Sequence, residues 1–210
     1  MVQGPGRVRK RLLAGVSTNV LVLGIVSLLT DMSSEMIYPI LPLFLTSIGA
    51  SGLVIGLIEG SAETTASLVK VISGWYSDKF NKRKKFVLSG YTLSSVTKPL
   101  LALVTNYWQV LGIRIVERIG KGIRSAPRDA LIADSTTPEK RGKAFGFHKA
   151  MDSTGAVLGP LLALPVLLTA VAVTTETYRL IFLLSTIPAF LAVAVIWMFA
   201  GNKILALIYP

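Results

Sequence analysis

The sequence predicts an all-α, polytopic membrane protein, organised as a bundle of six transmembrane helices. Hydrophobic residues make up 52% of the 210 residues, charged residues make up only 16%, and the mean hydropathy is +0.63. A soluble domain usually carries about 25% charged residues, so this composition favours a lipid environment. Because one span needs roughly 20 apolar residues, a chain of this length holds six spans joined by short connections.

Six apolar segments separated by polar connections are the expected spans. They cover residues 21–45, 53–76, 86–104, 107–126, 144–171 and 178–200. Pro39 and Pro42 in the first span and Pro99 in the third cannot donate a helical hydrogen bond, which predicts kinks there. The longest expected connection is the polar segment 127–143. The chain is therefore expected to comprise a basic cytoplasmic N-terminal segment (1–18), a six-helix membrane domain (19–200) and a short C-terminal tail (201–210).

The basic residues lie on alternate connections, which predicts the orientation in the membrane. They precede the first span, separate the second from the third, and separate the fourth from the fifth: Arg7, Arg9, Lys10, Arg11; Lys79, Lys82, Arg83, Lys84, Lys85; Arg128, Lys140, Arg141, Lys143. Connections rich in Lys and Arg remain in the cytoplasm. We therefore expect a multi-pass protein of the cell membrane with both termini in the cytoplasm.

Several function classes are disfavoured by the same residues. The net charge of +11 is concentrated in short segments beside apolar runs, whereas a nucleic-acid groove spreads basic residues over one face of a soluble fold. The chain has no cysteine and a single histidine, His148, and it contains no nucleotide-binding loop or cluster of metal ligands. We therefore expect no enzymatic activity, no metal, no cofactor and no nucleic-acid partner.

Charged residues inside the expected spans are the main signal of function. Asp31 and Glu35 lie on one helical face of the first span, Glu59 and Glu63 lie on one face of the second, and Arg114 begins a basic and acidic stripe in the fourth. Each such group costs roughly 2.5–3.5 kcal/mol at the bilayer centre, so these faces must point into the bundle or into a wet cavity. They are interpreted either as structural ion pairs or as a midplane site for substrate and coupling protons. The candidate residues are Asp31, Glu35, Glu59, Glu63, Arg114 and Arg118.

The connection after the second span carries a recognisable motif. Gly74, Asp78, Lys79, Lys82 and Arg83 match a pattern of a glycine, an acid four residues later and a series of bases. This pattern resembles the motif between helices two and three of the major facilitator superfamily. Asn81 stands where that motif has a second glycine, and asparagine also tolerates a left-handed turn. The resemblance implies that Asp78 locks the two halves of such a transporter together.

A second motif lies in the fifth span. Gly146, Gly155, Gly159 and Pro160 resemble the pattern that marks the antiporter branch of the same superfamily. Gly155, Gly159 and Ala163 recur every four residues and form a face on which another helix can approach closely. Arg118 followed by Gly122 also resembles the superfamily pattern whose arginine is implicated in proton transfer, with Arg114 as the rival candidate.

The resemblance implies that the chain is the N-terminal six-helix half of a twelve-helix transporter. The expected activity is proton-coupled antiport or export of a small molecule by alternating access, with Arg114 or Arg118 tuning the acids or binding an anionic substrate. The alternatives are a proton-coupled importer, or a truncated fragment that transports nothing. The expected partners are the substrate, protons, the lipid bilayer, and a second six-helix half or a second copy of the chain. The sequence does not identify the substrate, because one scaffold serves unrelated solutes.

Overall fold

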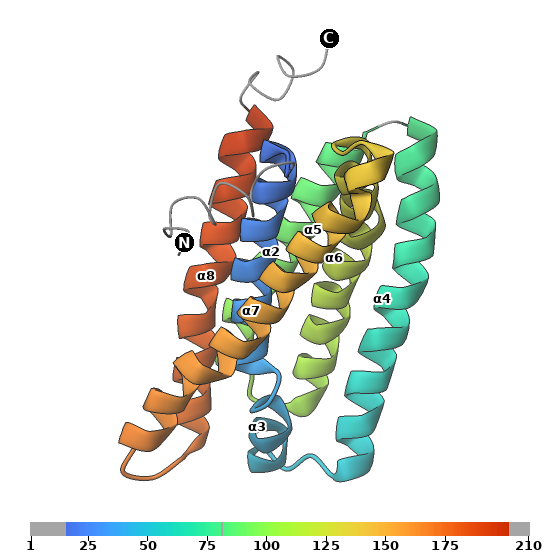
Figure 1. The fold of residues 1–210 in the computed structure, drawn as a ribbon. Helices are drawn as coiled ribbons and strands as arrows, with labels where there is room; N and C mark the ends of the chain where they lie inside the picture. Colours follow the sequence, from blue (N-terminus) through green and yellow to red (C-terminus); the bar gives the residue numbers. More distant parts are fainter. Residues whose placement is uncertain (1–15, 81, 202–210) are drawn as a thin grey trace, which may run out of the picture.

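The computed structural model describes residues 16–80 and 82–201, which form helices joined by short connections without any β-strand (Figure 1). The α-helices and the two 3-10 helices (η) are α2 (Thr18–Ile37), α3 (Leu41–Ser47), α4 (Gly52–Phe80), α5 (Arg83–Thr97), η1 (Pro99–Leu103), α6 (Tyr107–Asp134), η2 (Pro138–Lys140), α7 (Arg141–Thr169) and α8 (Thr175–Gly201). The all-α prediction is confirmed for this part of the chain. Asn81 and most of the expected N-terminal segment and C-terminal tail lie outside the described residues.

The long helices alternate in direction along the bundle (Figure 1). The connections after α4 and α6, which carry the basic residues, lie at one end, and those after α3, η1 and α7 lie at the other. Three helical segments of the described chain, Thr18–Ser47, Pro138–Thr169 and Thr175–Met198, are long and apolar enough to cross a membrane. The remaining long helices carry more charge or are shorter, so the count of six spans stays a prediction.

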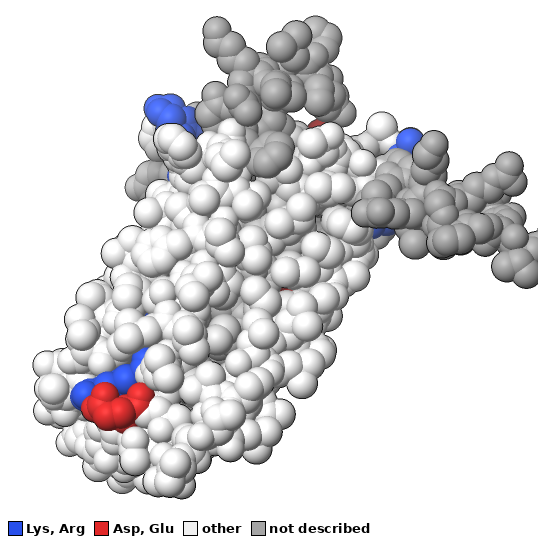
Figure 2. Space-filling view, turned by 90° about the vertical axis from the view of Figure 1, so that its left-hand side faces the viewer, with Lys and Arg blue, Asp and Glu red and all other residues white. Residues whose placement is uncertain are grey.

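One side of the bundle is almost free of charge. Figure 2 shows this side, where Lys, Arg, Asp and Glu atoms gather near the ends of the molecule. Large apolar side chains are exposed along α7 and α8, among them Leu161, Leu168, Ile187, Phe190 and Leu191. An exposed apolar surface of this kind fits contact with lipid.

Prolines lie at the breaks within the first and third expected spans. The first expected span is interrupted by a turn over residues 38–40, which contains Pro39, and Pro42 lies in the first turn of α3. Helix α5 likewise ends before Pro99 and continues as the 3-10 helix η1. The expected interruptions at Pro39 and Pro99 are confirmed, whereas Pro42 marks the start of α3 and not a kink.

The predicted connection 127–143 is wrong over residues 127–134, which are helical. Helix α6 continues through Pro127 to Asp134, and α7 already begins at Arg141. One proline removes a single backbone hydrogen bond, whereas the following residues are good helix formers and bury Ile132 completely. Burial of that turn outweighs the loss.

The first helix of each half of the chain packs against helices of the other half. The first helix of the first half, α2, packs mainly against α7 and α8, whereas the first helix of the second half, α6, packs mainly against α4 and α5. Helices α5 and α8 complete the bundle by contacting each other. This arrangement has the form of an internal repeat that a comparison of residues 20–105 with 106–200 does not reveal.

Two apolar clusters close the ends of the bundle. One contains Phe44, Leu101 and Phe182, and the other contains Val20 and Ile196. Between them lie buried polar and charged side chains from several helices: Ser27, Thr30, Ser33, Ser94, Ser95, Lys98, Glu117, Arg118, Arg124 and Ser185. The functional candidates therefore lie between two apolar caps.

Candidate functional site

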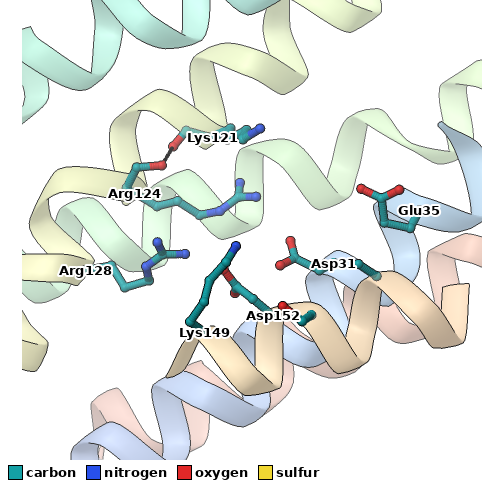
Figure 3. Close-up of a pocket in the computed structure, with 10 residues that line it drawn as sticks. Asp31, Glu35, Lys121, Arg124, Arg128, Lys149 and Asp152 are labelled. Atoms are coloured by element: carbon teal, nitrogen blue, oxygen red, sulfur yellow. Dashed lines mark hydrogen bonds and ion pairs between the residues drawn. The ribbon is translucent and has the colours of Figure 1, made fainter. Parts of the chain in front are cut away.

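Two adjoining cavities lie between the apolar clusters. The first, about 290 Å³, lies between α2, α4 and α6, and the second, about 340 Å³, lies between α2, α6 and α7 (Figure 3). We call their charged lining residues the charged layer: Asp31, Glu35, Glu63, Arg114, Glu117, Arg118, Lys121, Arg124, Arg128, Lys149 and Asp152. Five of the six candidates predicted from the sequence are in this layer, and the sixth, Glu59, is bonded to it.

Arg114 is the most firmly held member of the layer. Its Nε and Nη2 donate to the two carboxylate oxygens of Glu59 at 3.1 and 2.9 Å, and its Nη1 donates to Glu117. Only 4% of the side chain is exposed. A guanidinium and a carboxylate joined by two parallel hydrogen bonds form a geometrically fixed pair. Arg114 therefore fastens α6 to α4.

Arg118, one turn further along α6, is held much more loosely. Its Nη1 lies 3.5 Å from Glu63 Oε2, and the Glu63 side chain is 60% exposed. Its Nε is buried and has no hydrogen-bond partner among the described residues. The two rival arginines of the fourth expected span thus have different surroundings.

Asp152 is a member of the layer that was not predicted. Asp152 lies in the fifth expected span, four residues after His148. In the structure Asp152 accepts a hydrogen bond from Ser27 and lies beside Asp31 in the second cavity (Figure 3). The available signal was its spacing from Gly155 and Gly159, which puts all three on the face of α7 that meets α2.

Two buried bases were also missed. Lys98, directly after α5, is 1% exposed, and its Nζ donates to Ser33 Oγ at 2.6 Å and to Ser34 Oγ at 3.1 Å on α2. Arg124 on α6 donates to Ser94 Oγ at 2.6 Å and lies over the ring of Tyr91. Neither base forms an ion pair among the described residues. The serines that accept their hydrogen bonds do not form a periodic pattern in the sequence that would have predicted this role.

The residues of the fifth-span motif have different surroundings in the structure. A Cβ placed on Gly159 would lie 2.6 Å from the Met32 backbone oxygen, and Gly155 also faces the backbone of α2, so both glycines allow close contact. Pro160 lies inside α7 without ending it. Gly146 has no other atom within 4 Å of such a Cβ and takes no part in that contact.

The motif after α4 forms a small ionic cluster at the end of the bundle. Arg83 donates to Asp78 at 2.9 Å and also to Asp134 at the end of α6. Partial burial lowers the pKa of Arg83, but the hydrogen bonds to Asp78 and Asp134 outweigh this effect and raise it. Gly74 faces Ala126 of α6, and Lys82 is exposed. The predicted motif residues therefore link α4, α5 and α6.

Comparison with known proteins identifies the family. The model of the Major Facilitator Superfamily matches residues 23–204. An uncharacterized MFS-type transporter of Methanocaldococcus jannaschii is 48% identical over 149 residues, which cover 71% of this chain and 37% of that protein. The quinolone resistance protein NorA of Staphylococcus aureus is 26% identical over 125 residues, which cover 60% of this chain and 32% of NorA.

Solved structures show the same fold. The crystal structure of a bacterial homolog to the human lysosomal transporter Spinster superimposes with a TM-score of 0.69 at 16% identity. The match covers 94% of this chain and 45% of that one, so the chain spans less than half the length of the proteins it resembles. The proteins of this family are transporters and not enzymes. The chain belongs to the major facilitator superfamily of integral membrane transporters.

Proposed function

We propose that the chain is the N-terminal six-helix half of a proton-coupled antiporter that exports a small molecule by alternating access. The observation that carries this proposal is the pair of carboxyl groups, Asp31 and Asp152, in a cavity shared with basic side chains. The fifth-span motif and the similarity to a quinolone resistance protein favour export.

The carboxyl pair suits reversible proton binding. The carboxyl groups of Asp31 and Asp152 line the same cavity, so a proton held by either one would reduce the repulsion between them. Two carboxylates side by side repel each other, whereas the basic side chains of Arg124 and Arg128 in the same cavity attract them. Loss of the proton would leave two negative charges at the interface of α2 and α7 and would favour a change in their packing.

Alternating access needs a second unit that moves against this bundle. We propose that a second six-helix segment or a second copy of the chain closes the open side of the charged layer, where Glu63 is 60% exposed. In this arrangement all six long helices cross the cell membrane and both termini are cytoplasmic. The basic connections after α4 and α6 support that orientation.

The test is transport in everted membrane vesicles under an imposed pH gradient. Addition of a substrate from a panel that begins with quinolones should release protons in the wild type. Asp31→Asn and Asp152→Asn should abolish proton release, because each removes one carboxyl of the pair. Glu176→Gln, which changes an exposed acid outside the charged layer, should leave it intact.

The outcomes separate the competing functions. Proton-linked flux that persists in both Asn variants contradicts the coupling site. Uptake rather than export in the same vesicles, with protons moving alongside the substrate, supports the importer. A folded protein without flux, alone or with the second six-helix segment supplied, supports the fragment that transports nothing.

A further inference from the structure

Two arginines on successive turns of α6 face the same cavity, and only Arg114 donates a hydrogen bond from each of its three nitrogens to the described residues. The guanidinium of Arg114 uses Nε, Nη1 and Nη2 on Glu59 and Glu117. Since all three nitrogens of its guanidinium already donate to carboxylates, Arg114 has a structural role and is poorly available to a ligand.

Arg118 has the opposite character. It is 7% exposed, forms no hydrogen bond within the described residues, and buries an Nε that has no partner. A buried donor without an acceptor costs about 1–3 kcal/mol, and the penalty is larger for charged groups. A ligand that accepts hydrogen bonds at this position would remove that cost.

The surroundings of Arg118 favour an anion. Lys121 and Arg124 line the same cavity, and Arg124 has no carboxylate partner among the residues described. The acids that face the cavity are Asp31, Glu35, Glu63 and Glu117. Glu117 is bonded to Arg114, and Glu63 meets Arg118 and Lys121 only at 3.5 and 3.9 Å.

The shape of the site favours a carboxylate. An arginine presents two parallel N–H groups that match the two oxygens of a carboxylate, and such a pair is specific in direction as well as strong. The ring of Tyr38, whose centroid lies 6.0 Å from Arg118 Cζ, provides an apolar wall for the remainder of a ligand. A cavity of about 290 Å³ lies at the lower limit of small-molecule sites.

We propose that Arg118, with Lys121 and Arg124 beside it, binds the carboxylate group of the transported small molecule. Glu63 acts as the resident counter-ion and swings away when the carboxylate binds. This inference rests on the proposed transport function and deepens it, because it names the chemical class of the substrate.

The test is ligand binding to the purified chain in nanodiscs. Benzoate, benzamide, benzylamine and phenylphosphonate share one aromatic ring and differ in charge and head group. Lactate and succinate add carboxylates that have no ring. Benzoate or another carboxylate should raise the midpoint of thermal unfolding in a saturable way, whereas benzamide and benzylamine should have no effect. A response to phenylphosphonate alone contradicts the carboxylate and indicates a phosphate-like group.

Three variants locate the binding. Arg118→Lys keeps the positive charge but removes the paired N–H donors of the guanidinium, and Arg118→Gln removes both the charge and the paired donors. We therefore expect a loss of carboxylate affinity of about tenfold or more in each. Arg83→Gln removes an arginine outside the layer and should bind like the wild type. Because Arg118 makes no hydrogen bond to any residue that the structure describes, both of its variants should fold with a near-normal unfolding midpoint.

The proposal fails if no carboxylate binds, if benzylamine binds better than benzoate, or if Arg118→Gln retains carboxylate affinity. Failure of the proposed function gives a different result. Carboxylate binding that depends on Arg118 without proton-linked flux keeps the subsite and removes the transport mechanism. Proton-linked flux of a substrate without a carboxylate, unaffected by Arg118→Gln, keeps the mechanism and removes the subsite.

Discussion

The interface between α2 and α7 and the interface of α6 with α4 and α5 are built by the same packing device. Gly155 and Gly159 allow α7 to approach the backbone of α2. On the other side, Gly90 of α5 and Gly120 of α6 face each other's backbone, with the Gly120 oxygen 2.6 Å from a Cβ placed on Gly90. Close contact through glycines is therefore common to both halves of the bundle.

The two interfaces differ in their charges. Arg114 crosses from α6 to Glu59 on α4 in a bidentate pair that fixes both helices. Between α2 and α7 the charged groups are acids: Asp31 forms no ion pair among the described residues, and Asp152 meets His148 and Lys149 of its own helix. The comparison sets a fixed side around α6 against a side between α2 and α7, and we propose that this second side responds to protons.

The largest expected effect is on the fixed side. Arg114→Ala leaves Glu59 and Glu117 without their partner, and removal of one member of a buried pair costs about 3–5 kcal/mol. The free energy of unfolding in detergent measures this loss. Arg118→Ala is the matched control on the next turn, and we expect it to cost less than about 1 kcal/mol, because its exposed partner Glu63 is solvated without it. Equal losses in the two variants would contradict the different roles of the arginines.

Overpacking should damage both interfaces to a similar degree. Gly159→Val and Gly90→Val place methyl groups against backbone atoms of the neighbouring helix, at an expected cost of about 1–3 kcal/mol or more. Gly146→Ala is the control, because its Cβ meets no other atom within 4 Å. Unfolding midpoints compare the three variants. Damage by Gly146→Ala, or tolerance of valine on one side only, would show that the interfaces are not equivalent.

The smallest expected effect is at the end of the bundle. Arg83→Ala removes ion pairs to Asp78 and Asp134, whose side chains are 63% and 58% exposed, and exposed pairs contribute about 0–1 kcal/mol. The raised pKa of Arg83 means that its contribution is complete below the ordinary pKa of arginine and is lost only as pH rises above it. Unfolding at pH 6 and pH 8 should therefore show the same small difference from the wild type.

Local patterns in the sequence predicted much of this architecture. Apolar runs, prolines and the spacing of Asp31, Glu35, Glu59 and Glu63 are readable along one helix, and the structure brings these acids and Arg114 together. The partnership of Asp152 with Ser27 depends instead on how α7 crosses α2, which no single helix encodes. The error at 127–143 has a similar cause, since burial of Ile132 by neighbouring helices decides that α6 continues.

The charged layer inside the bundle, between α2, α4, α6 and α7, should be accessible to water. Because the chain has no cysteine, single cysteines can be introduced without removing native ones. Ser34→Cys and Ala156→Cys line the cavities, whereas Leu161→Cys lies on the exposed apolar surface of α7. A charged, membrane-impermeant thiol reagent should label the first two in membranes and should leave Leu161→Cys unlabelled. Labelling of Leu161→Cys with protection of both cavity positions would contradict the account.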